Sequence, residues 1–301
     1  MSDLPASLLP PVTAALRSLG DASAIRSARL LGGGCINHAM RVETGQGRYL
    51  LKWNADPLPG LFEAEAHGLR LLAATRTVRV PEVYACAEVE ENRPAFILME
   101  WLEGRDQPRS LERLGEQIAQ LHLEGLSPQN PPAYGLERDN YLGAVVQVNG
   151  WDTNWPRFFG ERRLRPQMEL AQRNGRLPPE RRRCLERVIE RLDDLLGGVS
   201  RRPSLTHGDL WGGNVIPGPD GLALIDPAVW YADRETEIAY SQLFQSFPPA
   251  FYAGYQSVWP LEPGYPERRD LYNLYHLVNH LNHFGESYGP RVDAVLRRFA
   301  G

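Results

Sequence analysis

The segment 206–228 constrains the fold of this chain more than any other part of the sequence. It reads Thr-His-Gly-Asp-Leu-Trp-Gly-Gly-Asn-Val-Ile, then Pro-Gly-Pro-Asp-Gly at 217–221, then Leu-Ala-Leu-Ile-Asp-Pro-Ala. Two short apolar runs around a turn of proline, glycine and aspartate are typical of a β-hairpin. Because a hairpin folds the chain back on itself, we expect Asn214 to lie beside Asp226.

The polar side chains of this segment have the chemistry that phosphoryl transfer needs. The amide oxygen of Asn214 and the carboxylate of Asp226 are ligands that magnesium prefers. Asp209 lies five residues before Asn214 and is left to orient a hydroxyl and accept its proton. We therefore predict that Asp209 is a catalytic base and that Asn214 and Asp226 bind Mg²⁺.

The basic residues of the chain are unusual in type. Lysine and arginine together number 33, and Lys52 is the only lysine among them. It lies in the strand-like run Arg-Tyr-Leu-Leu-Lys-Trp, just after a glycine-rich segment. A compact ammonium can touch two phosphates where a planar guanidinium would collide. We predict that Lys52 contacts the phosphates of a nucleotide. The alternative is that this lysine has no special role and reflects a single codon that escaped a bias towards arginine.

The glycine-rich segment reads Gly-Gly-Gly-Cys-Ile-Asn at 32–37 and lies between two predicted strands. Since it does not precede a helix, it is neither a dinucleotide-binding fingerprint nor a Walker loop. Glycines let backbone amides approach phosphates closely, as in the glycine-rich loops of kinases. We assign Gly33, Gly34 and Asn37 to nucleotide binding; a flexible turn is the alternative. A redox switch at Cys35 is a further hypothesis.

Two other parts of the first hundred residues are expected to contact the nucleotide. Glu65 lies on a predicted helix at 61–75, on the flank of its apolar stripe, where its carboxylate can pair with Lys52. An exposed helix charge is the alternative for this glutamate. In the connector after the last strand, we expect the Glu100 carbonyl and the Leu102 amide to bind the adenine edge.

Two tryptophans are candidate substrate contacts, and one histidine is a candidate support for the polar loop. Trp211 is a large apolar residue inside the loop, so it forms either a wall facing the substrate or an anchor for the loop. Trp155, in Asn-Trp-Pro-Arg-Phe-Phe, is a second candidate substrate contact. His207 directly precedes Gly-Asp, and we expect it to brace the loop.

The sequence divides into two regions that differ in their predicted secondary structure. Short strands and one amphipathic helix fill the first hundred residues, and helices follow, except for the hairpin. This pattern predicts an α+β fold with a small antiparallel-sheet lobe at 1–102 and a larger, mainly helical lobe at 103–301. The predicted strands are 29–31, 39–42, 49–52, 80–83 and 95–100, and the predicted helices are 8–19, 61–75, 110–123, 155–174, 178–196, 234–246 and 268–284.

Composition excludes several classes of protein. The 301 residues carry a net charge of −4, which gives no electrostatic reason to expect nucleic acid as a partner. No run approaches the roughly 18 apolar residues of a membrane span, and the first residues do not form a secretion signal. Three cysteines without Cys-x-x-Cys pairing suit a reducing compartment, so we expect a cytoplasmic protein.

The histidines at 276, 280 and 283 have helical spacing that suits zinc, but the apolar stripe around them favours a core helix.

Several segments together resemble the fructosamine kinase (ketosamine-3-kinase) family, a branch of the protein-kinase-like small-molecule kinases. His-Gly-Asp-Leu-Trp-Gly-Gly-Asn followed by Ile-Asp-Pro-Ala carries the resemblance, and its broader spacing is shared with aminoglycoside phosphotransferases and choline kinases. Matching blocks run from about residue 30 to the end of the chain. They include Phe-Glu-Ala-Glu-Ala at 62–66, Thr-Val-Arg-Val-Pro-Glu-Val at 77–83, Asn-Trp-Pro-Arg-Phe-Phe-Gly-Glu-Arg-Arg-Leu at 154–164 and Tyr-Ala-Asp-Arg-Glu-Thr-Glu-Ile-Ala at 231–239.

The resemblance implies a bilobal protein-kinase-like fold and an activity. The activity is phosphorylation, by ATP with Mg²⁺, of the third-carbon hydroxyl of ketosamines: ribulosamines, erythrulosamines or fructosamines, free or on a glycated protein side chain. Such phosphates decompose and free the amine, so the implied role is deglycation. The resemblance also implies that residues 233–235 support the aspartate loop.

Two other functions stay open at this point. One is a kinase of another amine-bearing small molecule, such as an aminoglycoside or an amino sugar, and the other is a nucleotide-binding module without catalysis. The sequence does not define the preferred sugar, the amine or the oligomeric state.

Overall fold

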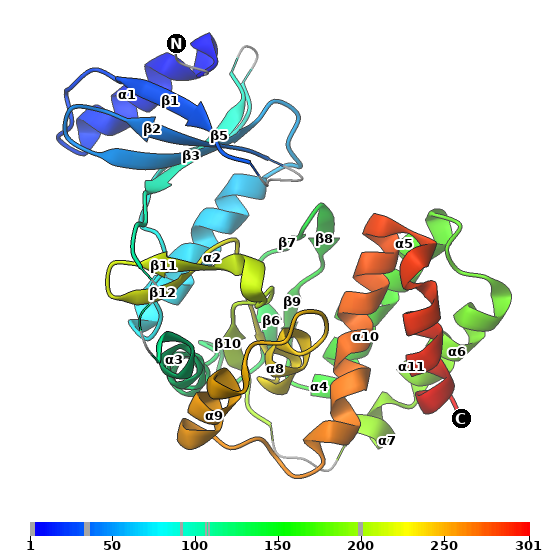
Figure 1. Ribbon diagram of the computed structural model, residues 1–301. Helices are drawn as coiled ribbons and strands as arrows, with labels where there is room; N and C mark the ends of the chain where they lie inside the picture. Colours follow the sequence, from blue (N-terminus) through cyan, green and yellow to red (C-terminus); the bar gives the residue numbers. More distant parts are fainter. Residues whose placement is uncertain (1–3, 33–36, 91–92, 106, 108, 198–200) are drawn as a thin grey trace. The chain divides into compact units, whose positions relative to one another are not determined.

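The computed structural model describes residues 4–32, 37–90, 93–105, 107, 109–197 and 201–301. Within these ranges the chain forms two compact units. Unit 1 comprises the residues up to 110 together with 215–227, and unit 2 comprises 111–214 together with 228–301. An antiparallel sheet dominates unit 1 and helices dominate unit 2 (Figure 1), which confirms the predicted α+β class. The lobe boundary after residue 102 stays a prediction.

Unit 1 is built on a five-stranded antiparallel sheet with the strand order β1-β2-β3-β5-β4. Met40 and Val42, two residues apart on β2, point to the same face and are fully buried. The last predicted strand before the connector is confirmed, but the one before it begins later than expected, because Pro81 has no N–H to pair with a neighbouring strand. The strands are β1 (Ser27–Leu30), β2 (His38–Glu43), β3 (Arg48–Asn54), β4 (Val83–Ala87) and β5 (Ala95–Glu100).

Two helices complete the sheet region of unit 1. Helix α1 (Leu9–Ser18) follows a short 3-10 turn, η1 (Ala6–Leu8), and joins Met40 and Val42 in one buried apolar cluster. Helix α2 (Leu61–Thr75) has the limits that the sequence predicts. Its predicted apolar stripe is buried: Leu61, Phe62, Ala66, Leu69 and Leu72.

The predicted hairpin forms and belongs to unit 1. Strands β11 (Val215–Gly218) and β12 (Gly221–Leu224) pair antiparallel, with Gly218 opposite Gly221. The hairpin is fixed to the rest of the unit, because the Leu224 amide donates to the Arg79 carbonyl at 2.8 Å. Gly104 lies against its turn so closely that a Cβ there would be 1.9 Å from the Gly218 oxygen. Glycine is therefore required at this point of the chain that leaves the sheet.

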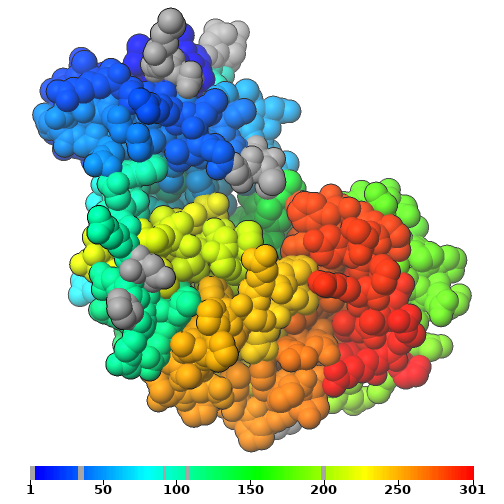
Figure 2. All heavy atoms as spheres, viewed as in Figure 1, coloured from blue at the N-terminus to red at the C-terminus, as the bar shows by residue number. Residues whose placement is uncertain are grey.

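Helices dominate unit 2, and α10 (Tyr265–Phe284) is the longest described helix. It packs on α5, α8 and α11, and in Figure 2 it adjoins α11 on the surface, as orange beside red. In the described part of the chain, no helix is both long and apolar enough to cross a bilayer. The other helices are α3 (Ser110–Glu124), α4 (Trp155–Phe158), α5 (Arg165–Arg173), α6 (Pro179–Glu190), α7 (Leu192–Leu196), α8 (Glu235–Ser241), α9 (Pro249–Val258) and α11 (Gly289–Phe299), with a π-helical turn η2 (Phe159–Leu164) and 3-10 turns η3 (Gly212–Asn214) and η4 (Glu286–Tyr288).

Unit 2 differs from the sequence-based expectation in several respects. The predicted helix 155–174 is interrupted by the π-helical turn, the predicted helix 178–196 breaks after Glu190, and the predicted helix 234–246 ends at Ser241. Helices α9 and α11 were not predicted. Unit 2 also holds short strands that the sequence did not predict, because runs of three residues show no periodicity. These strands are β6 (Tyr134–Leu136), β9 (Gly150–Asp152), β10 (Ser204–Thr206) and β13 (Trp230–Ala232) in one sheet, and β7 (Asn140–Leu142) with β8 (Val145–Gln147) in another.

A buried carboxylate fixes the start of the sheet in unit 1. Asp21 follows α1 and is only 3% exposed. Its oxygens accept hydrogen bonds from the Ser23 and Thr44 hydroxyls at 2.5 Å and from the Tyr49 hydroxyl at 2.9 Å. Burial alone would raise the pKa of Asp21, but these hydrogen bonds outweigh it and lower the pKa from 3.8 to about 2.

We expect Asp21→Asn to lower the free energy of unfolding by about 1–2 kcal/mol at pH 7, because the charged form accepts these hydrogen bonds. Since the native pKa lies below the ordinary value, this stabilisation is present above about pH 4 and is lost as the pH falls towards 2. Urea unfolding of both proteins at several pH values measures the difference. Asp56→Asn, at an exposed position, is the control, and an Asp21 effect that persists at pH 2 would contradict the assignment.

Candidate active site

Lys52 is the centre of a buried ion cluster in unit 1. It lies on β3, is 9% exposed, and its Nζ donates to Glu65 Oε1 on α2 at 2.7 Å. The same ammonium also pairs with the carboxylate of Asp226, which directly follows the hairpin. The predicted Lys52–Glu65 pair is thus confirmed.

Two carboxylates keep the Lys52 amine charged. Burial alone would lower its pKa, but the charges and hydrogen bonds of Glu65 and Asp226 raise the pKa above the ordinary value. The group is therefore an ammonium at neutral pH. A fixed, partly enclosed positive charge suits the stabilisation of phosphate oxygens.

Asp226 has an uncommon backbone. Its φ is +55°, in the left-handed region that non-glycine residues rarely adopt. Strained backbone of this kind is often found at functional sites, where the surrounding structure holds it. The Asp226 side chain is 46% exposed, so its carboxylate is accessible to a cation while it pairs with Lys52.

Asp209 and Asn214 lie together in unit 2. The Asn214 side-chain amide donates to the Asp209 carbonyl and to Asp209 Oδ2, both at 2.9 Å. These bonds use the Asn214 nitrogen, so the amide oxygen is the atom suited to a metal ion. The 3-10 turn η3, which ends at Asn214, brings the two side chains together.

The backbone before Asp209 needs a glycine. Gly208 has φ +82°, and a Cβ there would lie 2.0 Å from the Ala228 carbonyl oxygen. His207 is buried; its carbonyl accepts from the Ala228 amide at 2.9 Å, and its Nδ1 accepts from the Asp209 amide at 3.3 Å. The expected bracing role of His207 is therefore confirmed.

A buried glutamate holds this loop from α8. Glu237 Oε1 accepts from the Gly208 amide at 2.7 Å, and Oε2 pairs with His122 Nε2 at 2.9 Å. Burial alone would raise the pKa of Glu237, but its hydrogen bonds to His122 and to the Gly208 amide lower the pKa below the ordinary value. His122 Nδ1 in turn lies 2.9 Å from the Tyr255 hydroxyl. Sequence analysis missed Glu237, since nothing in its spacing distinguishes it from a core helix residue.

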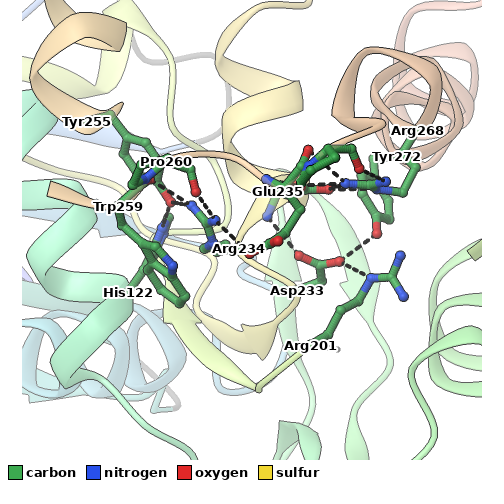
Figure 3. A network of polar contacts seen from close by, with 12 residues as sticks. His122, Arg201, Asp233, Arg234, Glu235, Tyr255, Trp259, Pro260, Arg268 and Tyr272 are labelled. Atoms are coloured by element: carbon green, nitrogen blue, oxygen red, sulfur yellow. Dashed lines mark hydrogen bonds and ion pairs between the residues drawn. The ribbon is translucent and has the colours of Figure 1, made fainter. Parts of the chain in front are cut away.

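Residues 233–235 form a second network beside the first (Figure 3). Asp233 pairs with Arg201 at 2.5 Å and accepts from the Tyr272 hydroxyl at 2.6 Å, and Glu235 pairs with Arg268. Arg234 donates to the Tyr255 hydroxyl at 3.0 Å, and its guanidinium lies 3.9 Å from the centre of the Trp259 ring. Asp233, Arg234 and Glu235 therefore link α8 to neighbouring elements. Of these three residues, only Arg234 contacts Tyr255, which belongs to the hydrogen-bonded series Glu237, His122 and Tyr255.

A buried phenol on α8 is influenced by the charge of the predicted base. Burial and then the charge of Asp209 raise the pKa of the Tyr240 hydroxyl above the ordinary value. Tyr240 and Glu237 are three residues apart on α8, which places them on the same side of the helix. No sequence pattern distinguishes Tyr240, because every residue of α8 is buried and no polar face stands out.

The remaining predicted contacts have mixed outcomes. Gly33 and Gly34 lie outside the described residues, as does Cys35. Asn37 Oδ1 accepts from the side-chain amide of Asn54 at 3.0 Å, which ties the end of the glycine-rich segment to β3. Glu100 ends β5, Leu102 follows it, and their contact with adenine stays a prediction.

The two tryptophans differ in exposure. Trp211 is 40% exposed and its ring covers Gly213, where a Cβ would lie 2.2 Å from the indole. Trp155 is 3% exposed and stacks on Trp230 with ring centres 5.8 Å apart. We therefore correct the expectation for Trp155: it is a core residue, because its indole is enclosed by other rings, whereas Trp211 stays a candidate substrate contact.

The histidines of α10 do not form a metal site. His276 stacks on Tyr240, and the Nδ1 atoms of His280 and His283 bond to backbone carbonyls one turn earlier. Among the residues that the structure describes, no group of three or more His, Cys, Asp or Glu side chains is arranged to hold a metal ion. The core-helix interpretation is confirmed.

Comparison with known proteins identifies the family. A family model described as "Fructosamine kinase" matches residues 12–300. The chain belongs to the fructosamine kinase family. A "Probable ketoamine kinase" of Synechocystis is 39% identical over 285 residues, 94% of this chain and 93% of the relative. A "Protein-ribulosamine 3-kinase, chloroplastic" of Oryza sativa subsp. indica is 36% identical over 288 residues, 95% of this chain and 82% of the relative.

Solved structures share the fold. A "Putative fructosamine-3-kinase" from Haemophilus somnus is similar with a TM-score of 0.84 at 30% identity, covering 97% of this chain and 96% of that one. An aminoglycoside phosphotransferase, APH(4)-Ia, in ternary complex with AMP-PNP and hygromycin B, is similar with a TM-score of 0.64 at 17% identity, covering 96% and 99%. This second likeness shows the fold alone, and together they confirm the predicted kinase-like fold.

We expect Glu237→Ala to lower the free energy of unfolding by about 3 kcal/mol, because it leaves the Gly208 amide buried without its acceptor. The loop that carries Asp209 then loses its support, so turnover falls more than about tenfold. Urea unfolding and steady-state kinetics measure the two effects. Glu169→Ala, on the exposed side of α5, is the matched control, and a Glu237→Ala protein with the wild-type unfolding midpoint would refute the role.

Proposed function

We propose that this protein is an ATP-dependent kinase that phosphorylates the third-carbon hydroxyl of ketosamines and thereby starts deglycation. The cluster of Lys52, Glu65 and Asp226 supports the proposal most directly, because it presents one ammonium and an accessible carboxylate for a nucleotide and its metal ion. Family membership and relatives named ketoamine kinase and ribulosamine 3-kinase support the acceptor class. The ternary complex of the phosphotransferase with AMP-PNP supports ATP as the donor.

In the proposed reaction, Asp209 accepts the proton of the acceptor hydroxyl as that oxygen attacks the γ-phosphorus of ATP. The bond from the γ-phosphorus to the β–γ bridging oxygen breaks, and ADP leaves. Lys52 neutralises charge on the phosphate oxygens, and Glu65 holds the ammonium in place. Positioning and electrostatic stabilisation therefore supply most of the rate enhancement.

The residues assigned to magnesium fit that ion. Asp226 offers a partly exposed carboxylate, and Asn214 offers an amide oxygen whose nitrogen is already bonded to Asp209. Both are hard oxygen ligands of the kind that Mg²⁺ binds. When bound with ATP, magnesium supplies charge neutralisation at the phosphates.

The acceptor class is tested by direct assay. Ribulosyl-lysine, fructosyl-lysine, a ribulosylated protein and an aminoglycoside are each incubated with the protein, ATP and Mg²⁺, and the phosphorylated position is determined by NMR. We expect a phosphate on the third carbon of the ketosamine sugars and no transfer to the aminoglycoside. Transfer to the aminoglycoside alone would move the protein to the other class of amine-directed kinases.

Removal of the base is the sharpest test of the mechanism. We expect Asp209→Ala to lower kcat by about 10²–10⁴, the usual scale for loss of a general base. ATP binding, measured by fluorescence of a nucleotide analogue, should stay within a few fold, because Asp209 acts on the acceptor. A variant that retains more than half of the wild-type turnover would remove Asp209 from the proposal.

Replacement of the single lysine tests the phosphate contact. We expect Lys52→Arg to lower kcat/KM for ATP by at least about 10², because a planar guanidinium does not reproduce the position of the buried ammonium. Arg48→Lys is the matched control on the same strand, since Arg48 pairs with exposed Glu103. The control should keep the wild-type kcat/KM. Wild-type kinetics in Lys52→Arg would contradict the assignment.

A further inference from the structure

A buried pair of carboxamide side chains lies on the β7–β8 hairpin of unit 2, outside the residues assigned to the reaction. Asn140 on β7 and Gln147 on β8 are directly opposite each other in the hairpin. Both are almost fully buried, and Gln147 Nε2 donates to Asn140 Oδ1 at 2.8 Å. Buried amides need partners for their donors and their acceptor, so their hydrogen bonds define which way each one points.

Both amides also donate to the backbone that follows Asp226. Gln147 Nε2 donates to the Ala228 carbonyl at 3.1 Å, and Asn140 Nδ2 donates to the Val229 carbonyl at 2.8 Å. Two side chains from neighbouring strands thus bind two successive backbone carbonyls. We name Asn140 and Gln147 the carboxamide clamp.

The orientation of the Gln147 amide is fixed by partners of opposite kind. Its nitrogen faces the Ala228 carbonyl, which can only accept, and its oxygen accepts from the Tyr275 hydroxyl at 2.9 Å. Burial raises the pKa of Tyr275 to about 12, so the phenol keeps its proton and donates. A reversed amide would place its oxygen against the Ala228 carbonyl oxygen, so the bonds select one orientation.

The hairpin that carries the clamp is held at both ends by α10. Tyr275 contacts its base through Gln147, and the Ala144 amide in its turn donates to His283 Nε2 at 3.0 Å. His283 Nδ1 donates to the Asn279 carbonyl at 3.0 Å, which leaves Nε2 as the acceptor. A clamp that is attached at two points to the longest described helix has little freedom to move.

A buried guanidinium adjoins the clamp on its other side. Asn149 Nδ2 donates to Asn140 Oδ1 at 2.9 Å, and Asn149 Oδ1 accepts from Arg163 Nη2 at 2.8 Å. The fully buried Arg163 guanidinium lies 3.9 Å from the centre of the ring of Trp230, the residue after Val229. The clamp therefore belongs to a connected polar network, which resists displacement of any one member.

Ala228 contacts the loop that carries Asp209 through both its amide and its carbonyl. The amide donates to the His207 carbonyl at 2.9 Å, and the carbonyl oxygen lies 2.0 Å from where a Cβ on Gly208 would be. Gly208 directly precedes Asp209. The position of Ala228 therefore limits where the backbone before Asp209 can lie, and Gln147 holds Ala228 at its carbonyl.

We propose that Gln147 is a positioning residue of the phosphoryl transfer: with Asn140, it holds Ala228 so that the backbone before Asp209 presents the base to the acceptor hydroxyl. This inference rests on the proposed function, in which Asp209 accepts the proton. A displacement of a reacting group by about 1 Å can lower a rate by about 10². The clamp is thus expected to affect turnover more than nucleotide binding.

The test compares Gln147→Met, which keeps the length of the side chain and removes its donor, with the wild type acting on ribulosyl-lysine. We expect kcat to fall at least about tenfold, while KM for ATP stays within about threefold. Backbone hydrogen exchange at 207–209 should become faster, because Ala228 is no longer held. In the Asp209→Ala background, Gln147→Met should cause much less than its single loss, because its effect passes through that base.

Two further variants separate positioning from a general loss of stability. Tyr275→Phe removes only the bond at the Gln147 oxygen, so kcat should fall by a smaller factor, about two- to fivefold, with KM for ATP unchanged. Asn282→Leu is the control: it removes a carboxamide of unit 2 that donates to the Gln167 carbonyl at 3.0 Å, and it should keep the wild-type kcat. Urea midpoints show that each variant is folded under the assay conditions.

The outcomes separate the inference from the proposed function. A wild-type kcat in Gln147→Met, unchanged exchange at 207–209, or an equal loss of kcat in Asn282→Leu would overturn the role of Gln147. If Gln147→Met does not fold, a wild-type kcat in Tyr275→Phe overturns it instead. If the wild type phosphorylates a ketosamine and Asp209→Ala does not, the proposed function holds even where Gln147→Met is unaffected.

Discussion

One buried ammonium joins three parts of unit 1 that are proposed to take part in the reaction. Lys52 on β3 pairs with Glu65 on α2 and with Asp226 after the hairpin, so it connects segments that are up to 174 residues apart in the sequence. Burial of charges is costly, and the cost is offset here because each charge has a partner. Loss of the ammonium would leave two carboxylates close together, each without a counter-charge. The cluster therefore contributes to the arrangement of unit 1 as well as to its chemistry.

Helix α8 has the corresponding role in unit 2. It is only seven residues long, yet it supplies Glu237, whose carboxylate holds the backbone amide of Gly208. The three residues before and at its start anchor the helix to α9, α10 and Arg201 through paired charges and ring contacts. A short helix can thus position the loop that carries Asp209 because its own position is fixed by buried polar bonds.

The parts of the site that are local in sequence could be predicted, and those that depend on packing could not. The hairpin, the helix that carries Glu65 and the loop from His207 to Asn214 follow from turn residues, an apolar stripe and motif spacing. Glu237 is on a helix that is buried on all sides, so no amphipathic pattern separates a side chain that supports the loop from a core one. Trp155 shows the opposite error, since an aromatic residue in a matching motif was assigned to the substrate although its ring belongs to the core.

The composition of the surface has a consequence for an enzyme that works on glycated amines. Reducing sugars add to neutral lysine side chains, and this sequence of 301 residues contains a single ε-amine. That amine is enclosed between two carboxylates and stays protonated, so it is a poor nucleophile towards an aldehyde. Arginine carries the remaining positive charge of the chain. The protein thus keeps the electrostatics of a lysine-bearing surface while offering almost none of the amines that its proposed substrates are made from.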